Sequence, residues 1–151
     1  MKIRFRCLWL ASGKPGNKAF KSSSMQDLFL EYTKRIANFT PCEWGGPAPD
    51  AVKASSSRVW MCDLGPRAKT LSSEEIAREL GRVANGGIAS LEILIGPPNG
   101  FKAEDHARIK PDLVWSFGPL TLPHELAAVV ASEQVYRAWT ILRGHPYHGG
   151  H

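Results

Sequence analysis

The segment Leu91–Gly100 reads LEILIGPPNG and joins a short apolar run to a loop of glycine and proline. Apart from Glu92, the residues Leu91–Ile95 are apolar, which is typical of a strand buried on both faces. Gly96 ends the run, and the two prolines that follow are residues of loops and turns rather than of strand interiors. The segment therefore predicts a buried strand whose carboxyl end opens into a loop.

The same unit of strand and loop recurs elsewhere in the chain. Arg58–Leu64 (RVWMCDL) and Leu113–Phe117 predict buried strands that end at glycine, and the alternating residues Lys2–Leu10 predict a half-buried strand. Helical periodicity separates these strands, at Ser24–Ala37, Leu71–Ala84, Lys102–Ile109 and His124–Arg143. Strands that alternate with helices predict an α/β fold with a mainly parallel sheet.

Three of these helices carry further signals. Ser72 and Glu75 have the spacing of a capping box, and Ile76, Leu80 and Val83 form the stripe expected to be buried. In the last helix, the segment 126–131 is apolar all round, which predicts burial on more than one side. The stripe of the first helix consists of Met25, Leu28, Phe29, Tyr32 and Ile36.

Two segments lack periodicity and are expected to be loops. The first is Ser12–Gly16, which contains glycine and proline, and the second is Pro41–Ser57, which is rich in glycine, proline, alanine and serine. We expect no regular structure in either of them.

Composition places the chain in a broad class. Its 151 residues suit a single domain spanning 1–151, and no apolar run is long enough for a transmembrane helix. Three cysteines without metal-ligand spacing, together with a charged N-terminal strand, indicate a cytoplasmic protein without disulfides. The net charge of +5 is compatible with RNA as a partner.

The carboxyl ends of three predicted strands are the expected place for a ligand, because open α/β sheets bind ligands there. They are the segments 62–65, 95–100 and 117–123, each of which contains glycine or proline. The sequence lacks the motifs GxGxxG, GxxxxGK[ST], GxSxG, HExxH and CxxC. We therefore expect a pocket lined largely by main chain, although ordinary turns remain the alternative for any one loop.

The C-terminal tail gathers His145, Tyr147, His148 and His151. A metal site is conceivable, but neither cysteine nor carboxylate accompanies these histidines. Contact with RNA through stacking and phosphate hydrogen bonds is the preferred interpretation, and no metal is expected.

The segment Leu120–His148, LTLPHELAAVVASEQVYRAWTILRGHPYH, closely resembles the C-terminal signature of the RlmH family. These bacterial enzymes methylate N3 of a pseudouridine in helix 69 of large-subunit ribosomal RNA. The segments ILIGPPNG, TLSSEEIAREL, MKIRF and EYTKRI are also similar to family segments, so the resemblance covers most of the chain.

The resemblance implies a SPOUT fold with a deep C-terminal trefoil knot and S-adenosyl-L-methionine as the cofactor. It further implies a homodimer, in which the tail of one subunit helps to build the RNA site, and a substrate in ribosomal RNA or the assembled ribosome. By position it assigns cofactor contacts to Cys62, Leu64, Gly96, Pro97, Gly100, Gly118, Pro119, Leu120, Thr121, Leu122 and Pro123.

Two departures from the family pattern concern loops. Pro97 stands where a second glycine is usual, so an N–H group is lost at this position. The region 41–57 is shorter than usual, with a family helix reduced or absent, and 65–70 is slightly longer.

Methylation of an imide nitrogen requires the loss of a proton, so a base or a cation is expected near the target. The candidates for catalysis are His124, Arg137, Tyr147 and His148. Each of the first three has a plainer alternative: His124 caps or packs at a helix start, Arg137 pairs with Glu133, and Tyr147 is a surface aromatic residue.

Two other functions remain open at the level of sequence. The chain is either a methyltransferase or, as Pro97 would suggest, a non-catalytic RNA- or ribosome-binding protein that retains the fold. Among enzymes, methylation of a ribose by another SPOUT group is the second alternative.

Overall fold

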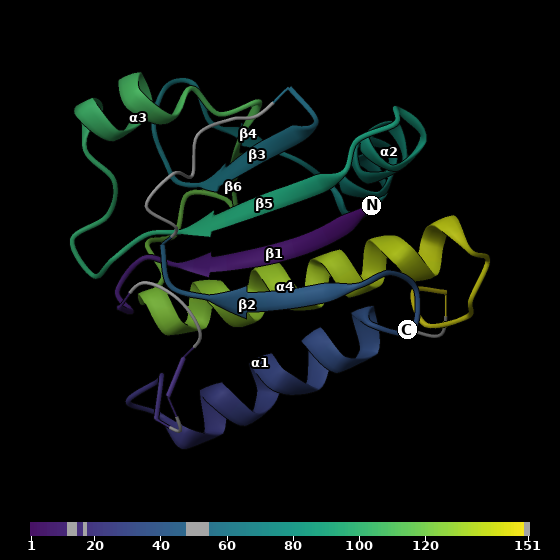
Figure 1. Cartoon of the computed structure of the whole chain (residues 1–151), viewed down its shortest axis with the longest axis horizontal. Helices are drawn as coiled ribbons and strands as arrows, with labels where there is room; N and C mark the ends of the chain where they lie inside the picture. Colours follow the sequence, from purple (N-terminus) through teal and green to yellow (C-terminus); the bar gives the residue numbers. More distant parts are fainter. Residues whose placement is uncertain (12–14, 17, 48–54, 150–151) are drawn as a thin grey trace.

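The computed structural model describes residues 1–11, 15–16, 18–47 and 55–149. Within them, strands in parallel pairing form one sheet in the order β2-β1-β5-β3-β6-β4 (Figure 1). The strands are β1 (Lys2–Cys7), β2 (Cys42–Gly45), β3 (Ser57–Cys62), β4 (Lys69–Thr70), β5 (Ser90–Ile95) and β6 (Leu113–Ser116). The helices are α1 (Ser23–Ile36), α2 (Ser73–Asn85), α3 (Ala103–Ile109) and α4 (His124–Leu142). The predicted α/β fold with a parallel sheet is confirmed.

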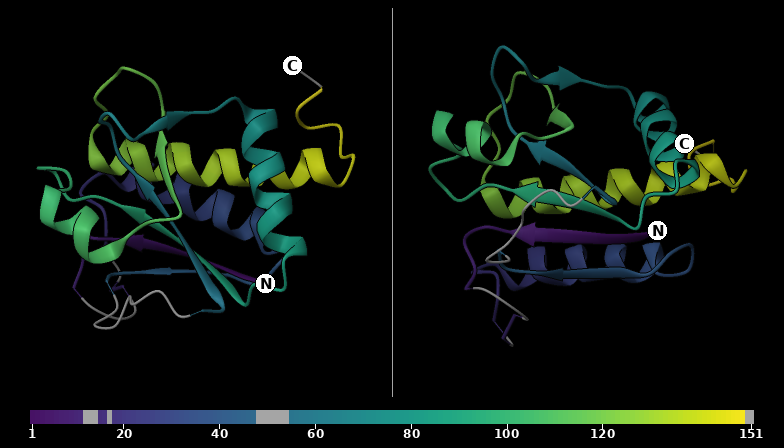
Figure 2. Two further views of the ribbon diagram at one scale, coloured as in Figure 1. Left: turned by 90° about the horizontal axis from the view of Figure 1, so that it is seen from above. Right: turned by 45° about the horizontal axis from the view of Figure 1, so that its top comes forward.

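The main core lies between one face of the sheet and the helices α1, α2 and α4 (Figure 2). Alternate residues of the strands, such as Phe5, Ile93 and Trp115, point into this core and are buried. The other face carries α3, where Ile109 and Phe101 pack on Val59, Met61 and Leu94. None of the helices in the described residues is long and apolar enough to cross a membrane.

Helix α4 packs against both α1 and α2. In its apolar start, Ala128, Val129 and Ala131 are buried, whereas Leu126 and Val130 are half-buried. Tyr136 of α4 packs against Tyr32 of α1, while the Ser73 hydroxyl of α2 donates to the side-chain Oε1 of Gln134 in α4. The buried Glu125 carboxylate accepts the backbone N–H groups of Lys21 at 2.7 Å and Ser22 at 3.1 Å. This carboxylate therefore joins the start of α4 to the start of α1, as buried carboxylates need such donors.

A row of ion pairs covers the part of the second face over β2, β1 and β5. Glu43 pairs with Lys2 at 3.0 Å and Arg4 at 3.1 Å, and Glu92 pairs with Arg6 at 3.0 Å. Hydrogen bonds from Lys2 and then Arg4 lower the pKa of the Glu43 carboxyl. The outer charges of β1 thus have partners on both neighbouring strands.

Three sequence predictions of local structure are wrong. The region 41–57 was expected to be a loop, but Cys42–Gly45 forms β2 and pairs with β1, whereas residues 48–54 lie outside the described part. β4 was not predicted, because two residues give no periodic signal. Leu28 was expected in the buried stripe of α1 and is 43% exposed, whereas Thr33 is buried. Of the predicted loop 12–16, residues 12–14 are likewise not described.

The capping box of α2 gives a prediction about stability. The Ser72 hydroxyl accepts the N–H of Glu75 at 3.1 Å, and the Glu75 carboxylate accepts the N–H of Ser72 at 2.9 Å. Ser72→Ala should lower the free energy of unfolding by about 1 kcal/mol, the usual cost of losing an N-cap. Urea unfolding at fixed protein concentration measures it, with Ser24→Ala, an exposed serine within α1, as the matched control. Equal effects of the two variants would contradict the role of the cap.

Candidate functional site

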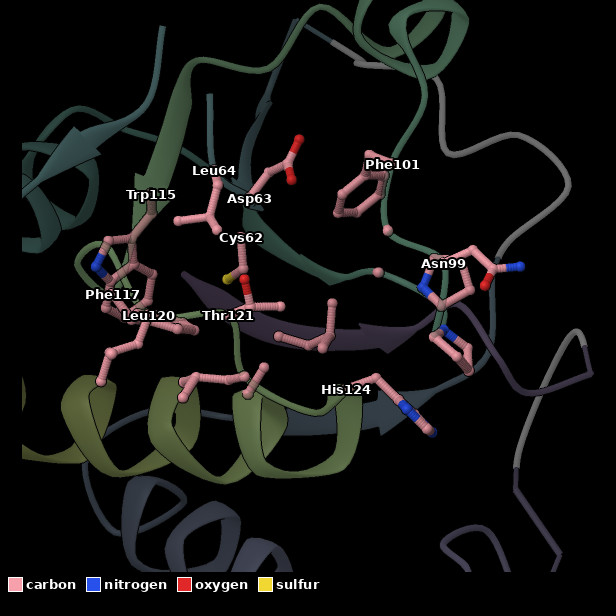
Figure 3. Close-up of a pocket in the computed structure, with 17 residues that line it drawn as sticks. Cys62, Asp63, Leu64, Asn99, Phe101, Trp115, Phe117, Leu120, Thr121 and His124 are labelled. Atoms are coloured by element: carbon pink, nitrogen blue, oxygen red, sulfur yellow. The ribbon is translucent and has the colours of Figure 1, made fainter. Parts of the chain in front are cut away.

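The carboxyl ends of three neighbouring strands meet around one cavity of about 320 Å³ (Figure 3). The register pairs Cys62 of β3 with Ile95 of β5 and with Trp115 of β6, so the three chains leave the sheet at nearly the same level. A cavity of this size lies within the range of small-molecule sites. It is lined by Cys62, Asp63, Leu64, Ile95, Gly96, Pro97, Pro98, Asn99, Gly100, Phe101, Trp115, Phe117, Leu120, Thr121, Leu122, His124 and Ala127.

The loop after β5 is a closed turn. The N–H of Gly100 donates to the Pro97 carbonyl at 2.8 Å, so that Pro97 opens the turn and Pro98 occupies its second position. Proline is favoured there because its φ is already fixed. Pro97 contributes its carbonyl to this turn, and the turn requires no N–H group at position 97. A proline in place of the family's second glycine is therefore compatible with an ordered loop.

Gly96 precedes this turn in close contact with an aromatic wall of the cavity. A Cβ atom at Gly96 would lie 3.0 Å from the ring of Phe101, closer than ordinary van der Waals contact. Glycine therefore lets the backbone of the β5 end approach the ring, and leaves main chain facing the cavity.

The β3 side of the cavity holds a thiol and a carboxylate. Burial raises the pKa of the Cys62 thiol, so it stays protonated at neutral pH. Asp63 comes next, and its Oδ2 lies 2.6 Å from Nε2 of His106 on α3. The residue pair thus connects the loop after β3 with the helix that follows the β5 loop.

The β6 side is apolar and ends in a sharp turn. The rings of Trp115 and Phe117 pack edge to face, with centroids 4.9 Å apart. Gly118 has a φ of 105°, which L side chains rarely adopt, and its N–H donates to the Ser116 hydroxyl at 3.1 Å. Leu120 follows at the rim of the cavity and is 68% exposed.

Helix α4 begins at the floor of the cavity with His124. Its ring packs edge to face on Trp9, with centroids 4.7 Å apart, and its Nε2 lies 3.9 Å from the Glu125 carboxylate. Figure 3 shows the imidazole directed away from the centre of the cavity. The ring of His124 therefore packs at the start of the helix in this structure, as the plainer alternative to a catalytic role proposed.

The other three candidates for catalysis form a separate cluster at the far end of α4. Arg137 pairs with Glu133 at 2.7 Å, and the Tyr147 hydroxyl donates to the same carboxylate at 3.0 Å. Arg137 also donates to Nδ1 of His148 at 3.1 Å, and Nε2 of His148 lies 2.8 Å from Glu74. Because a guanidinium only donates, Nδ1 of His148 accepts from Arg137 and Nε2–H donates to Glu74.

The environment of Tyr147 makes it a weak acid. Burial, followed by hydrogen bonding with Tyr32 and interaction with Glu133, raises the pKa of the phenol. The guanidinium of Arg137 lies 4.9 Å from the centre of the Tyr147 ring. The phenol therefore stays protonated and can serve as a hydrogen-bond donor.

The predicted site residues thus fall into two groups. Among the predicted cofactor contacts, eight line the cavity, whereas Gly118, Pro119 and Pro123 belong to the same segment without lining it. Of the predicted catalytic residues, only His124 lines the cavity, and Arg137 lies thirteen positions along α4, about 20 Å away at 1.5 Å per residue. The roles of both groups stay predictions.

Several lining residues were not predicted from the sequence, among them Asp63, Asn99, Phe101 and Trp115. Asp63 and Asn99 lie within the predicted loops, so the loop segments could have indicated them. Phe101 and Trp115 read as ordinary apolar residues, and only the fold shows that their rings reach the cavity. Within the described residues no group of His, Cys, Asp and Glu could hold a metal ion, and His151 lies outside them.

Comparisons with known proteins find similarity to methyltransferases along nearly the whole chain. The family model described as "Predicted SPOUT methyltransferase" matches residues 16–148. Proteins named ribosomal RNA large subunit methyltransferase H are similar as well. The one from Koribacter versatilis is 37% identical over 155 residues, covering 99% of this chain and 100% of the relative.

Two further proteins of that name match most of the chain. The one from Xanthobacter autotrophicus is 44% identical, covering 85% of this chain and 92% of the relative. The one from Deinococcus radiodurans is 42% identical, covering 80% and 86%. A solved structure of a putative methyltransferase from Legionella pneumophila with bound SAM aligns with 92% of this chain and 66% of its own chain, at a TM-score of 0.48 and 16% sequence identity.

The three thiols give a test of the packing around the cavity. Burial raises the pKa of Cys7 and of Cys42 to about 12 and raises that of Cys62 as well, so almost no thiolate exists at pH 8. Ellman's reagent at pH 8 should react slowly with the folded protein and rapidly with all three thiols in denaturant. Fast labelling of Cys62 in the folded protein, located by mass spectrometry, would show that the cavity wall is open.

Proposed function

This chain belongs to the SPOUT methyltransferase family, and we propose from that premise that it is an S-adenosyl-L-methionine-dependent methyltransferase of large-subunit ribosomal RNA in the cytoplasm. The target is N3 of a pseudouridine in helix 69, presented by the ribosomal RNA or the assembled ribosome. The observation that carries this proposal is the convergence of three strand ends on one cavity within the part of the chain that matches the family model.

The cavity fits the cofactor in chemistry and size. Its walls combine backbone near Gly96 and Gly100, which can hydrogen-bond to polar groups, with the apolar rings of Phe101 and Trp115. S-adenosyl-L-methionine supplies an electrophilic methyl group on a sulfonium when bound. The residues of this chain orient it and exclude water, which is the protein's share in such a reaction.

The order of the strands supports the knotted topology of the family. β6 lies between β3 and β4, although β3 and β4 are consecutive in the chain and are joined by residues 63–68. β6 therefore inserts between two strands that precede it in the sequence, and the chain then continues into α4. We propose that this passage closes the deep C-terminal trefoil knot of a single SPOUT domain.

A homodimer explains why the candidates for catalysis are separated along α4. One side of α4, with Leu126, Val130 and Ile141, is only half buried, and Leu120 is exposed beside it. Antiparallel packing of this side on a second copy would place each C-terminal tail at the partner's cavity, because α4 spans about 28 Å. The dimer thus supplies each site with the tail that its own chain holds too far away.

Within such a site the tail residues have distinct tasks. Arg137 offers fixed donors to phosphate or to the base, and Tyr147 offers a ring for stacking. His148 offers an imidazole whose Nδ1 can take the proton from the imide nitrogen. Glu133 and Glu74 hold these groups in the resting chain.

Methyl transfer to unmodified ribosomes tests the proposed function. Purified protein and S-adenosyl-L-methionine should add one methyl group to the large-subunit RNA, and mass spectrometry should place it on the pseudouridine base. A methyl group on a ribose would favour the other SPOUT group. Calorimetry without binding at millimolar cofactor would favour the non-catalytic RNA-binding protein.

Deletion of the tail separates catalysis from cofactor binding. Removal of Tyr147–His151 should abolish methyl transfer and leave the affinity for S-adenosyl-L-methionine unchanged, because the described tail residues lie outside the cavity lining. The matched control removes only Gly149–His151 and should stay active. Full activity of the longer deletion would exclude the tail from the reaction.

Subunit complementation tests the shared site. Gly96→Leu should block the cavity, because even a Cβ atom would contact Phe101, and the variant's loss of cofactor binding is verified by calorimetry. Co-expression with the tail deletion should restore about a quarter of the wild-type activity, since half of the dimers are mixed and one of their two sites is intact. A site built within one chain would give no activity in the mixture.

A further inference from the structure

The cavity differs in charge from the rest of the protein. The chain has a net charge of +5, yet the described residues that line the cavity include Asp63 and neither lysine nor arginine. His124, the other titratable side chain of the lining apart from Cys62, turns its ring toward Trp9 and Glu125. A ligand in this cavity therefore has one fixed carboxylate beside it, in an otherwise basic protein.

The carboxylate of Asp63 is held in place. It lies between the loop after β3 and α3, where Nε2 of His106 contacts Oδ2 at 2.6 Å. Both side chains are largely shielded, at 20% and 26% exposure, and the ring of Phe101 packs edge to face on that of His106. A hydrogen bond between the imidazole and this carboxylate orients the carboxylate.

The proposed cofactor and its by-product differ in charge at the reacting sulfur. Methyl transfer breaks the bond between carbon and sulfur, and the electron pair stays on the sulfur. The sulfonium therefore becomes a neutral thioether, while the rest of the molecule is unchanged. A fixed negative charge in the cavity wall distinguishes the two forms by Coulomb energy alone.

We propose that Asp63, positioned by His106, is the specificity-determining charge that makes this cavity prefer the sulfonium donor to the neutral by-product S-adenosylhomocysteine. The proposal rests on the proposed function. It assigns to Asp63 selectivity between two ligands, and to His106 the orientation of Asp63. It also favours dissociation of the by-product, because the attraction between Asp63 and the sulfonium ends when methyl transfer makes the sulfur neutral.

A purely structural role of the pair is the competing explanation. In that case Asp63 and His106 only join the loop after β3 to α3, and their loss weakens both ligands alike. The ratio of the two dissociation constants separates the explanations, because a general loosening of the cavity cancels in it.

Titration calorimetry of the full-length protein measures this ratio with S-adenosyl-L-methionine and S-adenosylhomocysteine. Asp63→Asn should weaken the sulfonium ligand about tenfold, the scale of one screened charge pair, and leave the neutral ligand nearly unchanged. Sinefungin, which carries an amine in place of the sulfonium, should follow the charged ligand. Glu104→Gln removes an exposed acid of α3 outside the lining, and as the matched control it should leave the ratio as in the wild type.

Variants of His106 test the positioning role. His106→Gln retains an N–H donor and should keep most of the selectivity, whereas His106→Ala should lose part of it. Equal weakening of both ligands by Asp63→Asn, or an unchanged ratio, overturns the proposal while leaving the proposed function intact. A wild-type protein that binds neither ligand overturns both.

Discussion

Parallel pairing of β3 with β5 on one side and β6 on the other determines where everything else in the cavity lies. Cys62 is level with both Ile95 and Trp115, so three separate loops leave the sheet at a common height. A shift of one residue in this register would turn every side chain of a strand to the opposite face. The thiol of Cys62, the backbone at Gly96 and the ring of Trp115 would then no longer face one space.

Much of this arrangement follows from the sequence because it depends on local signals. The strands at 58–64, 91–95 and 113–117 are apolar runs that end at glycine, and α2 begins at a capping box, so that physical chemistry within a few residues specifies each of them. β2 is different, because four residues at an edge are too short a stretch for alternation to stand out, and this strand depends on pairing with β1. Leu28 and Thr33 of α1 show the same limit, since neighbouring elements decide which helical face is covered.

The sequence predicted which loops form the candidate site, but it did not predict how charged side chains are arranged there. Glycine and proline indicate where backbone can approach a ligand, and this predicted the three loop segments, whereas eight of the lining residues were assigned individually only through the family resemblance. The contact between Asp63 and His106 joins residues that are 43 positions apart, and no spacing rule connects them. The separation of His124 and Arg137 follows from their positions in one helix. That only His124 lies at the cavity becomes evident once the fold places the cavity at one end of α4.

Short strands form the two borders of the sheet in this structure, β2 with four residues and β4 with two. A border strand exposes unpaired N–H and carbonyl groups, which can recruit another chain into an extended ladder. Here that exposed ladder is brief on both sides, and the charged Glu43 and Lys69 lie in these strands. Both borders therefore offer a further strand little backbone with which to pair, so the sheet is poorly suited to extension by another chain.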